Sequence, residues 1–186
     1  MPNDPSTQIL IGGIEKREIV IHDYDPTWPD KFASNAARIT AALGDTALRI
    51  DHIGSTSVPG LAAKPIIDVL VVVPNSADEA SYLPPLESAG YVLRVREPTF
   101  HEHRMVRTPE RDVHVHVFSP GTPEIDRYLI FRDRLRTNPA DRARYEATKR
   151  NLATRSWPDL NAYADAKTEI IESILATARA ASESRG

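Results

Sequence analysis

Residues 66–73, Ile-Ile-Asp-Val-Leu-Val-Val-Val, carry the strongest strand signal in the chain, because every position except Asp68 is apolar. A half-exposed strand alternates between apolar and polar residues, whereas a strand covered on both faces is a near-continuous apolar run. The pattern therefore predicts a central β-strand here. Residues 47–53 and 91–96 are predicted as further strands.

Two shorter β-patterns follow at residues 100–108 and 113–118, separated by Pro-Glu-Arg-Asp at residues 109–112. Such a polar, Pro-containing segment is typical of a turn, so we expect an antiparallel pair. Residues 17–22 predict a short strand at a sheet edge. Residues 1–15 are polar with scattered Gly and Pro, and are expected to form a flexible N-terminus.

Helical periodicity first appears after Thr27, which is expected to cap a helix that runs to Leu43 and ends at Gly44. Residues 76–89 predict a second helix, interrupted by two consecutive prolines. From residue 122 onward the pattern is helical throughout.

Three helices are predicted in that last part. The first ends at Asn138-Pro139, the second runs to about Arg155, and the third covers residues 159–181. Residues 182–186 are expected to form a frayed tail.

The chain has 186 residues, enough for one domain with a full core. We predict a single α/β (α+β) domain over residues 16–181. Its mixed sheet should be flanked by helices, with residues 122–181 as its helical C-terminal region.

Composition and charge exclude several classes of function. The formal net charge is −3, which does not suit an extended nucleic-acid-binding surface. The chain has no cysteine, so disulfides, thiolate catalysis and Cys-ligated metal centres are absent. No apolar run approaches the ~20 residues that a membrane-spanning helix needs. We therefore expect a cytoplasmic protein without a membrane partner.

The informative motif begins where the strand at residues 47–53 ends, in Gly54-Ser55-Thr56-Ser57. Glycine lets a ligand approach the backbone closely, and loop N–H groups and hydroxyls can form a concave site for an anion. Lys64 would add positive charge, and Asp68 follows on the next strand. Gly54, Ser55, Thr56, Ser57 and Lys64 are therefore our candidate phosphate-binding residues.

Asp68 is the candidate metal ligand, because a buried carboxylate is costly unless it binds a cation or accepts several hydrogen bonds. A phosphate loop beside a carboxylate suits nucleotide chemistry with Mg²⁺ or Mn²⁺, since the metal bridges carboxylate and phosphate oxygens. The alternative is an ordinary turn whose amides are capped by Asp68.

The segment His-Ile-Gly-Ser-Thr-Ser-Val-Pro-Gly-Leu-Ala-Ala-Lys-Pro-Ile-Ile-Asp at residues 52–68 resembles the hallmark of the GrpB family. The resemblance covers nearly the whole chain, through segments at residues 24–29, 114–117, 131–136, 145–150 and 163–167. It implies a nucleotidyltransferase-like fold with Asp68 as the catalytic carboxylate. The family is sometimes fused to dephospho-coenzyme A kinase, which implies a functional link to coenzyme A biosynthesis.

One departure from nucleotidyltransferases concerns the carboxylates. Enzymes of that type carry a second acid one residue beyond the first on the same strand, and a third on a neighbouring strand. Here Leu70 stands where the second acid would be, since residues i and i+2 share a strand face. The strand expected to bear the third acid carries His114 and His116 instead. Phosphoryl transfer with three carboxylates is therefore not available in its usual form.

Five of the six histidines lie between residues 52 and 116. His101 and His103 form one i, i+2 pair, and His114 and His116 form another, so each pair should point to one face of an extended strand. With Asp68, His114 and His116 make a candidate site for Zn²⁺, Mn²⁺ or Fe²⁺. Alternatively, they bind substrate phosphate or lie in a polar pocket.

The C-terminal helices are rich in arginine, and most of these side chains are expected on a solvated face among nearby acids. Arg132 and Lys149 are predicted to face the cleft instead and bind phosphate. Tyr128, Tyr145 and Tyr163 are interpreted as packing residues.

Three functions remain open at this point. The first is a nucleotidyltransferase-like protein that binds a nucleotide or phosphorylated small molecule with a divalent metal and transfers a nucleotidyl group. The second is a non-catalytic nucleotide- or metabolite-binding module on the same fold. The third is a metal-dependent hydrolase that uses the histidine cluster.

Overall fold

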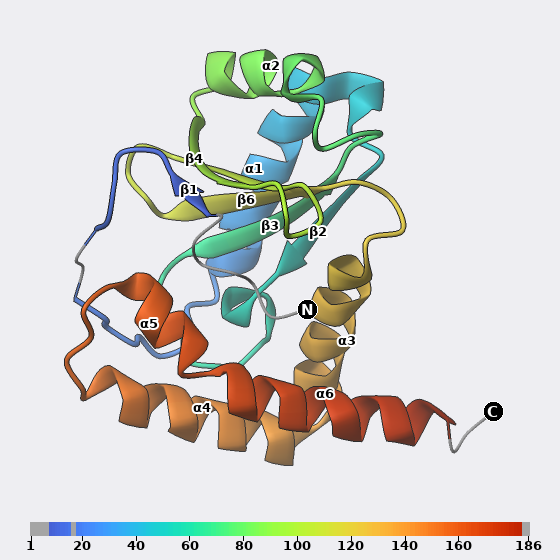
Figure 1. Ribbon diagram of the computed structural model, residues 1–186. Helices are drawn as coiled ribbons and strands as arrows, with labels where there is room; N and C mark the ends of the chain where they lie inside the picture. Colours follow the sequence, from blue (N-terminus) through green and yellow to red (C-terminus); the bar gives the residue numbers. More distant parts are fainter. Residues whose placement is uncertain (1–7, 16–17, 184–186) are drawn as a thin grey trace.

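The computed structural model describes residues 8–15 and 18–183. Six strands form one mixed sheet in the order β1-β4-β5-β6-β3-β2 (Figure 1). The strands are β1 (Ile9–Leu10), β2 (Arg49–Ile53), β3 (Ile67–Val72), β4 (Val92–Glu97), β5 (His103–Arg107) and β6 (Val113–Phe118).

The apolar strand predicted at residues 66–73 is β3, and it lies inside the sheet as expected. It pairs antiparallel with β2 and parallel with β6. The register places Asp68 beside His114, and Leu70 beside His116. The predicted antiparallel pairing of β5 with β6 is also confirmed.

Helices cover both faces of this sheet (Figure 1). On one face, α1 (Trp28–Leu43) and α2 (Leu83–Ser88) pack against Ile67, Val69 and Val71 of β3. On the other face, α3 (Pro123–Thr137) packs through Ile125 against Leu70. The expected mixed sheet flanked by helices is therefore confirmed.

The remaining helices gather beside α3. They are α4 (Pro139–Ala153), α5 (Leu160–Asp165) and α6 (Thr168–Glu183), and the described residues beyond 122 form no strand. A third apolar cluster joins Val58 and Leu61 of the loop before β3 to Leu135, Tyr145 and Ile174 of these helices. The helical region is thereby packed against the loop that carries the sequence motif. No helix in the described part of the chain is both long and apolar enough to cross a membrane.

The edge strand differs from the prediction. Residue 17 lies outside the described residues, residues 18–22 form no strand, and His22 makes only a single bridge to Ala63. The edge is instead β1, within the segment expected to be flexible, and it pairs antiparallel with β4. The guanidinium of Arg94 explains the order of this segment, because it donates hydrogen bonds to the carbonyls of Ile11 and Gly13.

Two predicted helices are shorter than expected. Residues 76–89 contain only a 3-10 turn (Glu79–Ser81) and the six-residue α2. The two prolines lie in the first turn of α2, where a missing N–H costs nothing, so the helix begins there. The helix predicted over residues 159–181 is split into α5 and α6. Of the tail expected to fray, residues 182–183 belong to α6, and residues 184–186 lie outside the described residues.

The expected cap of α1 is also different. The hydroxyl of Thr27 makes no capping hydrogen bond to the helix. It donates to Asp25 Oδ1 at 2.7 Å, and the same carboxylate oxygen accepts from the Thr27 N–H at 2.8 Å. Asp25 therefore fixes the start of α1 from outside the helix.

Candidate functional site

A cavity of about 400 Å³ lies between the α3 side of the sheet and the C-terminal helices. Asp68 of β3 and His114 and His116 of β6 form one wall. Side chains from the loop after β2 and from α3, α4 and the α5–α6 region line the rest, among them Ser55, Lys64, Tyr128, Phe131, Tyr145, Lys149, Tyr163 and Lys167. The cavity thus joins segments that are far apart in the sequence.

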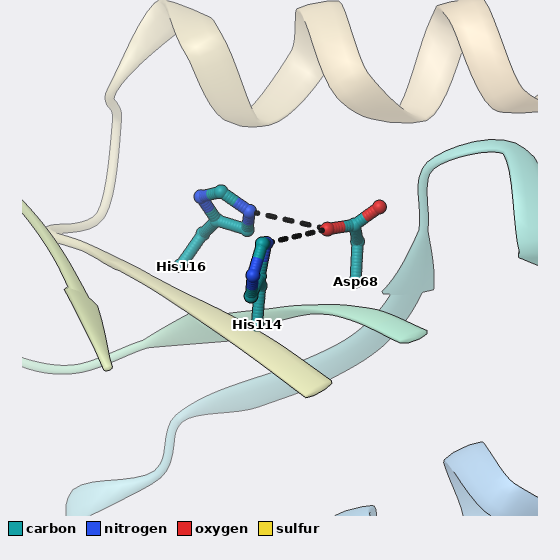
Figure 2. Close-up of side chains that lie close together, drawn as sticks. All are labelled: Asp68, His114 and His116. Carbon is teal, nitrogen blue, oxygen red and sulfur yellow. Dashed lines mark ion pairs between the residues drawn. The ribbon is translucent and has the colours of Figure 1, made fainter. Parts of the chain in front are cut away.

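The structure brings Asp68, His114 and His116 together (Figure 2). Asp68 Oδ1 lies 3.6 Å from His114 Nδ1 and 3.6 Å from His116 Nε2. One possible ligand atom from each residue lies within 4.8 Å of the others. Parallel pairing of β3 with β6 explains this convergence, because residues 68, 114 and 116 then share one face of two adjacent strands.

Electrostatics leave this cluster able to bind a cation at neutral pH. Burial lowers the pKa of His114 to about 4, against a weaker opposing effect of Asp68, so the imidazole is neutral and keeps a lone pair. Burial works to raise the pKa of Asp68. The interactions with His116 and His114 and the charge of Lys64 outweigh it and hold that pKa below its usual value. The site therefore offers a carboxylate and neutral imidazole nitrogen.

Of the four predicted loop residues, Gly54, Ser55 and Thr56 line the cavity, but Ser57 does not. The hydroxyl of Thr56 donates to the Ile66 carbonyl, and that of Ser57 donates to the Gly54 carbonyl at 2.6 Å. These two hydroxyls therefore hold the loop rather than face a ligand. Sequence alone did not reveal this, because the residues form a 3-10 turn (Ser55–Ser57) that bends their side chains back onto the backbone.

Three lysines line the cavity. Lys149 is 2% exposed, its Nζ donates to the Ala62 carbonyl, and it lies 4.8 Å from the ring centroid of Tyr145. Burial, reinforced by the charge of Lys167, lowers the pKa of Lys149 to about 7. Lys64 and Lys167 place their Nζ atoms 5.1 Å and 4.8 Å from the ring centroid of Tyr163.

Tyr163, whose ring lies beside Lys64 and Lys167, carries a further polar group, its hydroxyl. The side chain is fully buried, and its oxygen has no hydrogen-bond partner among the residues that the structure describes. A buried hydroxyl without a partner is unfavourable by about 1–3 kcal/mol. Together with the ammonium groups, it makes this end of the cavity suited to an oxygen-rich anion.

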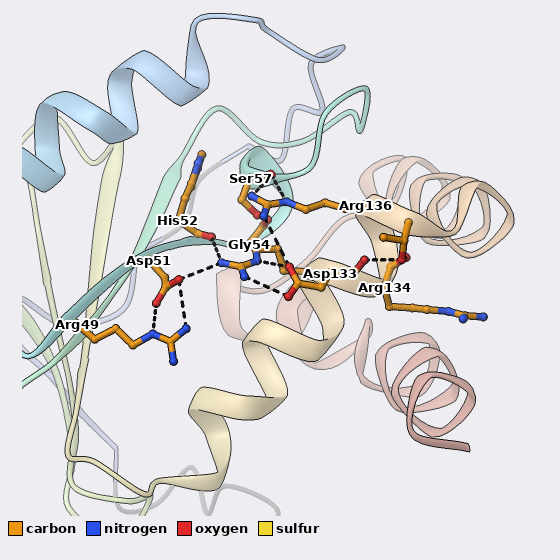
Figure 3. Close-up of polar contacts among 10 residues, drawn as sticks. Arg49, Asp51, His52, Gly54, Ser57, Asp133, Arg134 and Arg136 are labelled. Atoms are coloured by element: carbon orange, nitrogen blue, oxygen red, sulfur yellow. Dashed lines mark hydrogen bonds and ion pairs between the residues drawn. The ribbon is translucent and has the colours of Figure 1, made fainter. Parts of the chain in front are cut away.

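Arg132 does not face the cavity, contrary to the prediction. Its Nη1 donates to Asp51 Oδ1 at 3.3 Å and to the His52 carbonyl at 3.2 Å, and its Nε donates to Asp133 at 2.7 Å. Arg136 likewise donates to the Ser57 carbonyl (Figure 3). Arg132 therefore joins α3 to β2, and Arg136 joins α3 to the motif loop.

Of the other histidine pair, only His103 reaches this cluster. His103 lies beside His116, with 3.1 Å between His103 Nε2 and His116 Nδ1. His101 is exposed in the turn before β5, with a left-handed φ of 55°, so it does not join the cluster. His103 Nδ1 is 2.5 Å from Glu97 Oε2, which connects a buried carboxylate to the site.

Several cavity residues were not predicted as functional. Tyr128, Tyr145 and Tyr163 were interpreted as packing residues but line the cavity, and Arg127 and Lys167 also belong to it. Arg127 is already paired with Glu124 and Glu172. The sequence could have indicated Lys167, because it lies four residues after Tyr163 in one of the segments that resemble the family.

Comparisons with known proteins agree with this arrangement. The family model described as GrpB protein matches residues 18–177. A UPF0157 protein of Halalkalibacterium halodurans is 53% identical over 175 residues, covering 93% of this chain and 90% of that protein. A dephospho-CoA kinase of Mycolicibacterium paratuberculosis is 32% identical over 169 residues, covering 77% of this chain but 42% of the kinase.

The solved structures include a crystal structure of the conserved protein GrpB from Enterococcus faecalis. It superimposes with a TM-score of 0.74 and 34% identity, covering 86% of this chain and 96% of that one. The family match spans β2, the motif loop, β3, β6 and the helices that line the cavity. The chain therefore belongs to the GrpB family.

Proposed function

We propose that this protein binds a nucleotide or another phosphorylated small molecule together with a divalent metal ion, in the cavity over β3 and β6. The observation that carries the proposal is the convergence of Asp68 Oδ1 with His114 Nδ1 and His116 Nε2, at 3.6 Å each. A carboxylate beside neutral imidazole nitrogen is a donor set for a metal ion.

The donor set fits Mn²⁺ better than Mg²⁺. Magnesium prefers oxygen ligands in an octahedron, whereas imidazole suits metals of the Mn²⁺ to Zn²⁺ series. Asp68, His114 and His116 would hold the ion. A bound ion of this kind neutralises phosphate charge and polarises a phosphoryl oxygen.

The phosphate groups would lie between the metal ligands and the lysines. Lys64 and Lys167 lie over Tyr163 and supply positive charge, and Lys149 supplies it below about pH 7. Gly54 and Ser55 line the same cavity and allow close approach to the backbone. The aromatic rings of Tyr128 and Phe131 give an apolar wall for a base or another organic group.

The reaction, on this proposal, is nucleotidyl transfer, by resemblance to nucleotidyltransferases, with Asp68 as the catalytic carboxylate. One observation favours a second candidate function, ligand binding without transfer. Leu70 is fully buried in the apolar cluster with Phe118 and Ile125, so the position of a second carboxylate is filled by packing. The relation to a segment of a dephospho-CoA kinase supports a ligand linked to coenzyme A biosynthesis.

Calorimetric titration with nucleoside triphosphates, dephospho-coenzyme A and pyrophosphate, each with and without Mn²⁺, tests the proposal. We expect Mn²⁺-dependent binding and a rise in unfolding free energy of about 2.7 kcal/mol at a ligand concentration 100 times Kd. Release of pyrophosphate from a bound triphosphate would separate transfer from simple binding. If neither Mn²⁺ nor any phosphorylated ligand binds the wild-type protein, the proposal is wrong.

A further inference from the structure

A line of polar side chains runs from the cavity across three neighbouring strands of the sheet. Glu97 ends β4, His103 begins β5 and His116 lies in β6. Glu97 Oε2 is 2.5 Å from His103 Nδ1, and His103 Nε2 is 3.1 Å from His116 Nδ1. Glu97 and His103 are 4% and 6% exposed, so water does not compete for these bonds. The last member, His116, turns its other ring nitrogen toward Asp68 (Figure 2).

The direction of these hydrogen bonds follows from Glu97, which lies at the end of the line farthest from Asp68. An ionised glutamate can only accept hydrogen bonds. Glu97 Oε1 accepts from Gln8 Nε2 at 2.5 Å, and the orientation of the Gln8 amide is set by Asn161, whose Nδ2 donates to Gln8 Oε1 at 2.8 Å. Glu97 Oε2 must then accept from His103 Nδ1, which places a hydrogen on that nitrogen.

The tautomer of His103 fixes that of His116. His103 is 6% exposed, and a second proton would place a charge in this buried position, so its ring carries one proton and Nε2 is left as an acceptor. The two ring planes lie within 12° of parallel, which suits an in-plane bond between them. Its donor can only be the N–H at His116 Nδ1. In the neutral ring of His116, Nε2 therefore carries the lone pair.

That lone pair faces Asp68 Oδ1 at 3.6 Å, so two acceptors meet with no hydrogen between them. A cation is the group that two facing acceptors bind together. We propose that Glu97, acting through His103, is a positioning residue that holds His116 in its Nδ1–H tautomer and keeps the Nε2 lone pair ready for a cation. The role of this tautomer in cation binding rests on the proposed metal site, whereas the assignment of the tautomer does not.

The test is Glu97→Gln in the full-length, metal-free protein. Because Asn161 and Gln8 direct an N–H₂ group toward the position of Glu97 Oε1, the new amide must place its oxygen there and its own N–H₂ group toward His103. His103 would then carry its proton on Nε2 and donate to His116 Nδ1. The proton of His116 would move to Nε2, where it blocks the lone pair.

Nitrogen NMR of the histidine rings reads this change directly. We expect the Nδ1–H tautomer of His116 in the wild type and the Nε2–H tautomer in Glu97→Gln. A wild-type His116 protonated at Nε2, or a tautomer that does not change in the variant, would overturn the proposal. Because no metal is present, this result is independent of whether the proposed function is correct.

Titration with Mn²⁺ and Zn²⁺ gives the second readout. We expect affinity to fall about 10- to 100-fold in Glu97→Gln, as for other partners that orient metal-binding histidines. Glu79→Gln is the matched control, since Glu79 forms its ion pairs with Arg96 and Arg104 rather than with a histidine ring. Equal affinity in the wild type and Glu97→Gln would contradict the proposal.

His103→Phe is the second variant if Glu97→Gln does not fold. Its ring can keep the contact with Phe118, whose centroid lies 4.6 Å from that of His103, but it removes the acceptor for His116. We expect His116 to populate both tautomers and to bind Mn²⁺ more weakly. A single Nδ1–H tautomer in this variant would show that His103 does not set it.

Discussion

Gly54 lies so close to Asp68 that no side chain fits between them. A Cβ atom on Gly54 would stand 2.3 Å from Asp68 Oδ2 and 3.0 Å from Asp68 Cβ and Cγ. The backbone of Gly54 has φ 70° and ψ −175°, a region that is essentially accessible to glycine only. Position 54 therefore requires glycine, because any side chain there would collide with the Asp68 carboxylate.

Gly54→Ala should lower the free energy of unfolding and displace the Asp68 side chain. Backbone strain of this kind costs about 1–3 kcal/mol, and the clash adds to it. Gly60→Ala is the matched control, because Gly60 also has a positive φ (76°) but no atom within 4 Å of its added Cβ. The difference between the unfolding free energies of the two variants, measured by urea denaturation, gives the cost of the clash. Equal destabilisation would mean that the contact with Asp68 has no cost.

Asp68→Asn should still fold but lose the Mn²⁺-dependent part of nucleotide binding. The substitution keeps the shape of the side chain and removes the charge that would hold the cation. Among the described residues, Asp68 contacts His114 and His116, and the Gly54–Ser57 loop donates no hydrogen bond to it. Calorimetry and urea denaturation measure the two effects.

Asp51→Asn serves as its control, since Asp51 pairs with Arg49 and Arg132 outside the cavity. Its Mn²⁺ binding should match that of the wild type. Destabilisation of Asp68→Asn by about 1–3 kcal/mol with unchanged Mn²⁺ binding would show that Asp68 is structural.

Acid should destabilise the protein through His52. Burial lowers the pKa of His52 from its ordinary value of about 6.5 to about 4, so the unfolded chain binds its proton first as the pH falls. The unfolding free energy then decreases from about pH 6.5 downward, by about 3 kcal/mol once the pH is below 4. The lowered pKa of His114 acts in the same direction.

His52→Gln should flatten this part of the pH dependence, measured by urea denaturation between about pH 4 and pH 7. The exposed His101, changed to Gln, is the control and should leave the curve as in the wild type. A His52→Gln protein that loses stability with acid as steeply as the wild type would refute the assignment.

Anion binding should weaken as the pH rises through about 7, because burial and the charge of Lys167 bring the pKa of Lys149 to that value. Sulfate is a suitable probe, since its own charge is constant in this range. Its affinity is expected to fall between about pH 6 and pH 8, and Lys149→Met should remove that dependence. Lys31→Met, at an exposed surface lysine, should keep the wild-type profile.

The amino-acid sequence by itself determined the local features of this protein. The apolar run around Asp68 predicted an interior strand, and the i, i+2 spacing placed His114 and His116 on one face. Both follow from the two-residue repeat of a β-strand, which is a property of the backbone. The helical character after residue 122 was equally readable, because periodicity extends over many turns.

Tertiary structure decided which of these features meet. The parallel register of β3 with β6 places His114 beside Asp68, and no local pattern encodes a pairing between strands so far apart in the chain. Packing of α3 turned Arg132 toward Asp51 and away from the cavity, although its sequence position suggested a phosphate ligand. Only the folded sheet brings Glu97 and His103 to His116, because hydrogen bonds between side chains on different strands depend on non-local register.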